Sequence, residues 1–135
     1  QKEVEEIVRL RELTDLISLT GPVYGEKKVA LMKSADILAH PSFNDCFPLV
    51  LLEAMSLSLP IISTFEGAIP EIVDNGITGF LVTPKDPESL ADKLEVLIND
   101  PELRKDMGDA ARIKYENEFT LEIFENRLRE ILERQ

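Results

Sequence analysis

The sequence predicts an α/β fold in which a parallel sheet of about four strands is flanked by helices. Short apolar runs alternate with helical patterns along the chain, which is typical of successive strand–helix units. The runs at 36–40, 60–64 and 79–83 are too apolar for edge strands that face water, so none of these three is expected to be one. At 135 residues the chain has the size of one domain with a substantial core, and a single domain over residues 1–135 is expected.

Each predicted element follows from a local pattern. The apolar runs predicted to be strands span residues 16–19, 36–40, 60–64 and 79–83. Apolar residues at helical spacing predict helices over residues 2–13, 26–35, 48–57 and, briefly, 69–73.

The last third of the chain is predicted to be helical. Asp86 and Asp100 are expected to cap two of its helices, because each is followed by Pro and then Glu. Thr120 is expected to cap the final helix. The apolar stripe of that helix is predicted to belong to the core and comprises Leu121, Phe124, Leu128, Ile131 and Leu132.

Composition excludes several classes of function. The net charge is 15 − 26 = −11, which argues against a nucleic-acid partner. A single cysteine rules out an internal disulfide and fits a reducing compartment. The sequence contains neither an apolar run of membrane-spanning length nor a signal peptide at its start, so a cytoplasmic location is predicted.

The most informative segment runs from Asp45 to Glu53. Pro48 is expected to take the first position of a helix, and two carboxylates eight residues apart flank that helix start. The unpaired first-turn N–H groups and the helix dipole form an anion site between them. This layout suits a ligand with hydroxyls at both ends and phosphate in the middle, as in a nucleotide-sugar.

Residues 35–82 also resemble a known family. Residues 41–55 read Pro-Ser-Phe-Asn-Asp-Cys-Phe-Pro-Leu-Val-Leu-Leu-Glu-Ala-Met, and 59–64 read Leu-Pro-Ile-Ile-Ser-Thr. Residues 67–73 read Gly-Ala-Ile-Pro-Glu-Ile-Val, and 76–82 read Gly-Ile-Thr-Gly-Phe-Leu-Val. In this order the motifs resemble the C-terminal, donor-binding domain of retaining family 4 glycosyltransferases, whose GT-B fold contains Rossmann-like domains. Two residues depart from the family pattern: Asp45 stands where Glu is usual, and Ala68 replaces the second Gly of a pair.

The resemblance implies roles for individual residues. Glu53 would accept hydrogen bonds from the ribose hydroxyls, and Asp45 would lie near the donor sugar, where it favours positive charge at the anomeric carbon. Backbone amides of Phe47, Leu49 and Val50 would contact the sugar and the diphosphate. Cys46 would be a small residue near the sugar. The alternatives are an exposed helix glutamate for Glu53 and a helix cap for Asp45.

The segment Gly21, Pro22 and Val23 would hold the nucleotide base, because similar enzymes bind the base after the strand predicted at 16–19. A plain strand-to-helix turn is an equally good interpretation of these residues. His40, the only histidine, ends a predicted strand where the family usually has an apolar residue. A packed or hydrogen-bonded structural role is expected for it.

The resemblance also implies that the chain is a fragment. The family domain has six strands, and the first two, with their glycine-rich turn and diphosphate-binding Arg and Lys, have no counterpart here. The segment 16–19 would then pair beside 36–40 or borrow a strand from another copy, giving self-association through unpaired strands. The acceptor-binding domain is also missing, so the isolated chain is expected to be inactive.

These patterns predict the donor-binding part of an enzyme that moves a hexose, with retention, from a nucleotide-diphospho-sugar to a glycan or lipid-linked acceptor. The residues of the motif are most similar to those of bacterial enzymes that make surface polysaccharides. The enzyme is therefore expected in the cytoplasm or at the inner face of the membrane. No metal or cofactor is expected, because the sequence has neither a Cys/His set nor an Asp-x-Asp motif. The alternatives are a non-catalytic nucleotide-sugar-binding module and a nucleotide-sugar epimerase of GT-B type.

Overall fold

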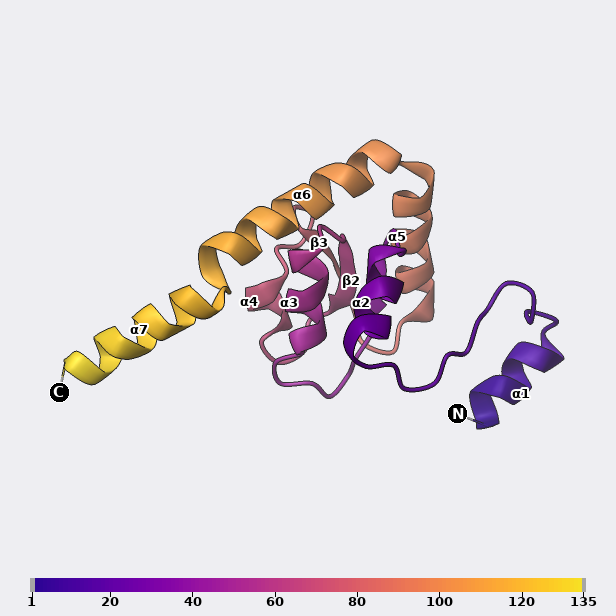
Figure 1. Ribbon diagram of the computed structural model, residues 1–135. Helices are drawn as coiled ribbons and strands as arrows, with labels where there is room; N and C mark the ends of the chain where they lie inside the picture. The colour runs from indigo at the N-terminus through magenta and orange to yellow at the C-terminus, as the bar shows by residue number, and fades with distance from the viewer. Residues whose placement is uncertain (1, 135) are drawn as a thin grey trace. The chain divides into compact units, whose positions relative to one another are not determined.

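The computed structural model describes residues 2–134 and divides into two compact units, residues 1–31 and 32–135. Figure 1 shows the helices and strands in chain order. They are α1 (Lys2–Leu10), α2 (Gly25–Lys33), β1 (Leu38–His40), α3 (Leu49–Ser56), β2 (Ile61–Thr64), α4 (Ile69–Ile72), β3 (Gly79–Val82), α5 (Pro87–Asn99), α6 (Pro101–Glu118) and α7 (Leu121–Glu133).

In the first unit, the strand predicted at residues 16–19 does not form. The amides of Leu16 and Ile17 instead hydrogen-bond back to the carbonyl oxygen of Leu13, at 3.0 and 2.9 Å, so they close a local turn. The side chains of both residues are exposed, as is that of Leu19. A short apolar run becomes a strand only where a partner strand accepts its hydrogen bonds, and residues 2–134 supply none to this segment.

In the second unit, the sheet has three parallel strands in the order β1-β2-β3, rather than about four. Leu38 pairs with Ile61 and His40 with Ser63, while Ile61 pairs with Gly79 on the other side. All four residues of β2 are buried. β1 lies at the edge of the sheet with Ala39 exposed, so the expectation that none of the strands faces water is wrong for 36–40. Pairing of the segment 16–19, with 36–40 or with another copy, stays a prediction.

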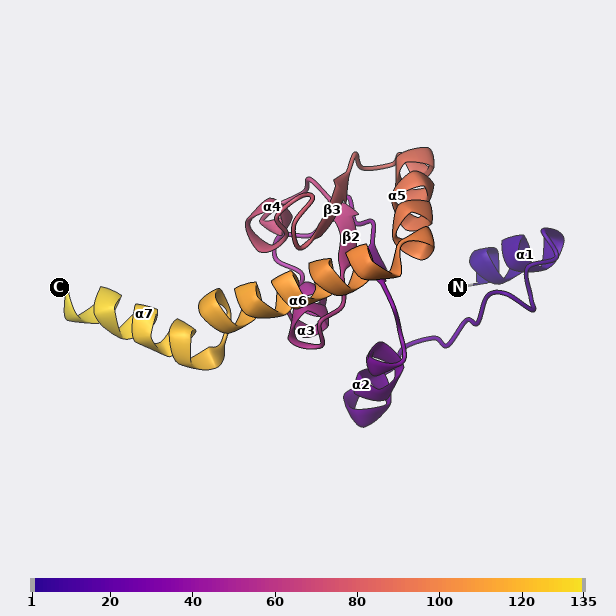
Figure 2. The same cartoon turned by 90° about the horizontal axis from the view of Figure 1, so that it is seen from above.

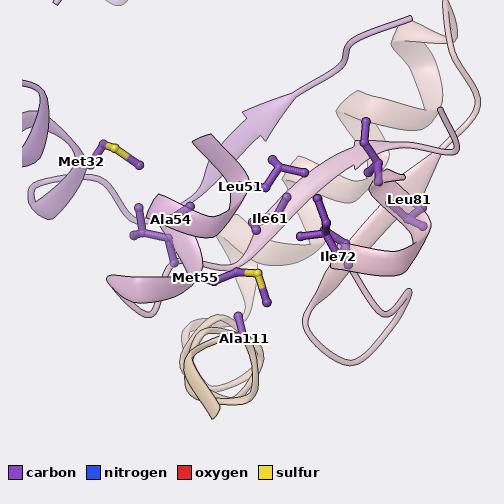
Figure 3. Close-up of a cluster of buried hydrophobic side chains, with 11 residues drawn as sticks. Met32, Leu51, Ala54, Met55, Ile61, Ile72, Leu81 and Ala111 are labelled. Carbon is purple, nitrogen blue, oxygen red and sulfur yellow. The ribbon is translucent and has the colours of Figure 1, made fainter. Parts of the chain in front are cut away.

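The core lies on both faces of this sheet. Successive residues of a strand point to opposite faces, so Ile61 and Ile62 belong to two separate clusters. Figure 3 shows the first cluster, where Leu51 and Met55 of α3 lie near Ile61. Helix α4 packs in this cluster, whereas α5 covers the other face through Leu97. The fold is therefore the α/β class that the sequence predicts.

The long helix α6 joins the two clusters. Ala111 packs in the first and Met107 in the second. At Gly108 between them a Cβ atom would lie 2.1 Å from the carbonyl oxygen of Ser58, so only glycine permits this close approach. Figures 1 and 2 both show α6 passing beside the sheet and α7 projecting beyond it.

Cationic side chains of α6 also bind the carboxyl ends of neighbouring helices. Arg112 donates to the carbonyl oxygen of Ser56, at the end of α3. Lys114 Nζ donates to the carbonyl oxygen of Glu71 in α4 at 3.0 Å and to Asp74 Oδ1 at 2.8 Å. Positive groups satisfy the last carbonyls of a helix and oppose its dipole. Helix α6 therefore fixes both α3 and α4 against the sheet.

The predicted helix caps are confirmed. Asp86 Oδ1 accepts a hydrogen bond from the amide of Ser89 at 3.0 Å, and Asp100 Oδ1 accepts one from Leu103 at 2.9 Å. Thr120 Oγ1 accepts one from Ile123 at 3.4 Å. Among residues 2–134, no helix is both long and apolar enough to cross a membrane.

The predicted burial of the stripe on α7 is wrong. All of its members are exposed, by 43% to 71%: Leu121, Phe124, Leu128, Ile131 and Leu132. Periodicity shows that a helix has an apolar face, but an interacting surface must be present before that face is buried. In the second unit, α6 is the one element that lies close to α7, and it does so where α7 begins.

Candidate functional site

The candidate site is built around the start of α3, at the carboxyl end of β1. Pro48 is the N-cap residue, with φ −75° and ψ 105°, and Leu49 is the first helical residue. Pro48 thus lies one position earlier than predicted, and its buried ring packs against the protein. Among the described residues, no side chain caps this helix. The amides of Leu49 and Val50 belong to the first turn, whose N–H groups have no acceptor within the helix, so they can bind an anion.

The loop from β1 to α3 is held by hydroxyl groups at the end of β2. Ser63 Oγ donates to the carbonyl oxygen of His40 at 2.7 Å, and Thr64 Oγ1 donates to that of Ser42. Both hydroxyl-bearing residues are buried. Side chains of the central strand therefore fix the path of the loop before it reaches the helix.

The segment after β2 holds the far end of the same loop. The amide of Ala68 donates to the carbonyl oxygen of Cys46 at 2.9 Å. Gly67 has φ +53°, and a Cβ atom there would lie 2.2 Å from the carbonyl oxygen of Asp45. Ala68 has φ −90°, as expected from its replacement of the second family glycine. Gly67 is thus required both by its backbone conformation and by contact with the loop.

Asp45 lies in this loop, and its carboxylate pairs with His40. The distance between Asp45 Oδ2 and His40 Nε2 is 3.3 Å. The alternative in which Asp45 caps the following helix is wrong, because α3 has no side-chain cap. His40 has the hydrogen-bonded role that the sequence predicts, although its partner was not foreseen.

Glu53 lies in the second turn of α3 and is half-buried, so it is not the fully exposed glutamate of the alternative interpretation. Its carbonyl oxygen accepts a hydrogen bond from Ser56 Oγ at 2.7 Å. Phe47 and Leu49 are exposed, whereas Val50 packs at the edge of the core. Cys46 is exposed, so its contacts with the neighbouring loop are made by its backbone.

Gly21, Pro22 and Val23 belong to the first unit, between α1 and α2. They follow no strand, so the argument that they lie at a strand's carboxyl end does not hold for this structure. Gly21 has φ +65° and lines a pocket of about 330 Å³ together with Val4, Ser18, Leu19 and Thr20. A role for residues 21–23 in binding the base stays a prediction.

A further pocket, of about 280 Å³, opens near the carboxyl ends of β1 and β3. It is lined by Pro41, Phe43, Val82, Thr83, Lys85, Asp86, Pro87 and Leu90. Lys85 Nζ lies 4.9 Å from the centre of the Phe43 ring, a cation–π contact. Lys85 therefore places a positive charge at the same edge of the sheet as the start of α3. The sequence holds no signal for this contact, because Phe43 and Lys85 are 85 − 43 = 42 positions apart in the chain.

The chemistry of the site is that of anion and hydroxyl recognition. It offers first-turn amides for a phosphate, and carboxylates that accept hydrogen bonds from hydroxyls. Within residues 2–134, no group of three or more His, Cys, Asp or Glu residues is arranged to hold a metal ion.

Comparison with known proteins identifies the family. The sequence pattern of "Glycosyl transferases group 1" matches residues 1–114, which is most of the chain. The chain therefore belongs to this family, and its α/β unit is a GT-B C-terminal-type domain. The C-terminal domain of the group 1 glycosyl transferase LpcC from Francisella tularensis is 30% identical, with a TM-score of 0.81 over 89% of this chain and 62% of that one.

Two curated relatives are similar in sequence. D-inositol 3-phosphate glycosyltransferase of Pseudarthrobacter chlorophenolicus is 34% identical over 114 residues, 84% of this chain and 27% of that protein. A sulfoquinovosyl transferase of Arabidopsis thaliana is 40% identical over 96 residues, 69% of this chain and 19% of that protein. The chain thus spans about a quarter of the length of such relatives.

A third similarity is in fold. HepE of Anabaena, solved in complex with UDP, has a TM-score of 0.92 at 24% identity over 99% of this chain and 36% of that one. The same protein has also been solved with UDP-glucose. Together these comparisons confirm the family resemblance drawn from residues 35–82.

Proposed function

We propose that the chain is the donor-binding part of a longer glycosyltransferase. The whole enzyme would transfer a hexose, with retention, from a nucleotide-diphospho-sugar to a glycan or lipid-linked acceptor. The observation that carries this proposal is the uncapped start of α3 at the carboxyl edge of a parallel sheet, with Asp45 before it and Glu53 inside it. Ligands of open α/β sheets bind at this edge.

In this proposal the diphosphate binds at the helix start. The amides of Leu49 and Val50 donate to its oxygens, and the positive end of the helix dipole offsets its charge. The exposure of Phe47 and Leu49 supports this assignment, because the surface over the first turn is accessible to a ligand. The carboxylate of Glu53, one turn further on, accepts hydrogen bonds from the ribose hydroxyls.

The sugar is proposed to lie against the loop between β1 and α3. Asp45 accepts hydrogen bonds from its hydroxyls and stabilises positive charge as the bond to the diphosphate breaks. Cys46 and the amide of Phe47 would contact the sugar from the same side as Asp45. The base is assigned to residues 21–23 by the family resemblance alone.

The comparisons support a nucleotide-sugar as the donor and a separate domain that binds the acceptor. HepE was solved in complex with UDP and with UDP-glucose, and the matched segment covers only 27% of the Pseudarthrobacter relative and 19% of the Arabidopsis one. An acceptor-binding domain outside this chain would complete the active site, so the 135-residue chain alone would carry out no transfer. A cytoplasmic location, or one at the inner face of a membrane, fits an enzyme that uses cytosolic nucleotide-sugars and lipid-linked acceptors.

Calorimetric titration of the complete polypeptide that carries this chain tests the proposal, with UDP and UDP-glucose as probes. Glu53→Ala should weaken binding of both ligands by about 1.5–3 kcal/mol, the value of a hydrogen bond to a charged group. Glu88→Ala is the matched control, since Glu88 is an exposed glutamate in the first turn of α5. Equal affinities of the Glu53 and Glu88 variants, with intact folds, would exclude Glu53 from the site.

A further inference from the structure

The pair formed by His40 and Asp45 links the sheet to the candidate sugar site. The distance between His40 Nε2 and Asp45 Oδ2 is 3.3 Å. An ionised carboxylate can only accept hydrogen bonds, so the donor in this pair is the N–H group at Nε2. The two side chains are 28% and 32% exposed, so both remain accessible to a ligand. Hydrogen bonds of free sites are commonly long and shorten when a ligand binds.

His40 is anchored in the sheet by its backbone. It is the last residue of β1 and pairs in register with Ser63 of the central strand. Ser63 is fully buried, and its Oγ donates to the carbonyl oxygen of His40 at 2.7 Å. The backbone of His40 is therefore anchored in the sheet, and its imidazole contacts a carboxylate five residues further along the chain.

Asp45 needs such a support more than a longer acid would. Its side chain is one methylene shorter than the glutamate usual at this position, so it has less reach toward a ligand. A carboxylate has about four lone-pair sites on two oxygens, and a bond from His40 to Oδ2 uses one of them. The bond fixes the direction of the carboxylate and leaves acceptor capacity for a hydroxyl group.

We propose that His40 is a positioning residue, which orients Asp45 toward the hexose of the donor. The inference rests on the proposed function, because it requires a sugar beside Asp45. His40 contributes to recognition of the hexose and not to recognition of the nucleotide. Its effect acts entirely through the carboxylate of Asp45.

The test uses the complete polypeptide that carries this chain, titrated with UDP-glucose and with UDP. His40→Phe keeps a ring of similar size and removes the donor. It should weaken UDP-glucose binding about tenfold, as expected for one hydrogen bond to a charged group. The affinity for UDP should change less than about twofold, because UDP has no hexose.

Two conservative variants separate positioning from packing. The amide nitrogen of His40→Gln lies near the place of Nε2 and should restore most of the affinity for UDP-glucose. His40→Asn, whose amide is too short, should not restore it. This pair also replaces His40→Phe if that variant fails to fold. The double variant of His40→Phe and Asp45→Ala should bind UDP-glucose no more weakly than Asp45→Ala alone.

The remaining outcomes overturn the inference. Equal loss for UDP and UDP-glucose would show a general structural role for His40, as would additive losses in the double variant. If Glu53→Ala weakens UDP binding but no His40 variant affects UDP-glucose, only the inference fails and the proposed function stands. If the unsubstituted protein binds neither ligand, the proposed function fails for uridine donors and the inference fails with it.

Discussion

Helix α3 and the three helices α5, α6 and α7 begin in different ways, although all four belong to one unit. The later helices each start with a side-chain cap, from Asp86, Asp100 and Thr120. Helix α3 starts at Pro48 and has none. Its stability comes instead from burial, since Leu51, Ala54 and Met55 are all inaccessible to solvent. Helix α7, by contrast, has a cap and no buried residue.

The difference shows how a helix start can serve a ligand. First-turn amides that bind a side-chain cap cannot also bind a phosphate. A helix anchored by packing can leave those amides for a ligand, and α3 is anchored in this way.

The largest effect is expected where α3 is anchored. Leu51→Ala should lower the free energy of unfolding of the 135-residue chain by about 3 kcal/mol, because it leaves a cavity in the core. Urea denaturation measures this. Leu49→Ala is the control on the same helix, with a side chain 66% exposed, and should change stability by less than about 0.5 kcal/mol. Similar losses for the two variants would mean that packing does not anchor α3.

A smaller effect is expected at the capped starts. Asp86→Ala and Asp100→Ala should each lower the free energy of unfolding by about 1 kcal/mol, since each leaves a first-turn amide without its acceptor. Asp92→Ala, at an exposed position inside α5, provides the comparison. If all three substitutions have the same effect, the caps contribute nothing specific to stability.

The smallest effect is expected on introducing a cap at α3. Pro48→Ser places a hydroxyl at the N-cap, whereas Pro48→Ala changes the backbone in the same way without an acceptor. The serine variant should be the more stable by about 0.5 kcal/mol in urea denaturation. In the complete polypeptide it should bind UDP more weakly than the alanine variant, because the hydroxyl competes for the amides. Tighter UDP binding by the serine variant would contradict the role proposed for the helix start.

The sequence predicted most of the second unit because its signals are local. The Asp-Pro-Glu pattern before α5 and α6 specifies a helix start through residues within one turn of it. The apolar runs of β2 and β3 formed strands because each is next to another strand in the sheet. The predicted strand at 16–19 failed because its hydrogen-bond partners had to come from elsewhere.

The candidate site was predicted in part. The order of the motif residues along the chain predicted the helix start and the two acids that flank it. The positive φ of Gly67 and its contact with the loop at Asp45 were found only in the structure. The pairing of His40 with Asp45 was missed because a side-chain contact across a loop depends on the path of that loop. The same holds for Lys85, which reaches Phe43 only because β1 and β3 end at one edge of the sheet.

By itself, the sequence determined which segments become helices, where they are capped, and which motif surrounds the start of α3. These features depend on spacing and on neighbouring residues, so they are encoded within a few positions. The tertiary structure decided which apolar faces are buried, which strands have partners, and which side chain contacts Asp45. Those outcomes depend on surfaces that lie far apart in the chain and meet only when it folds.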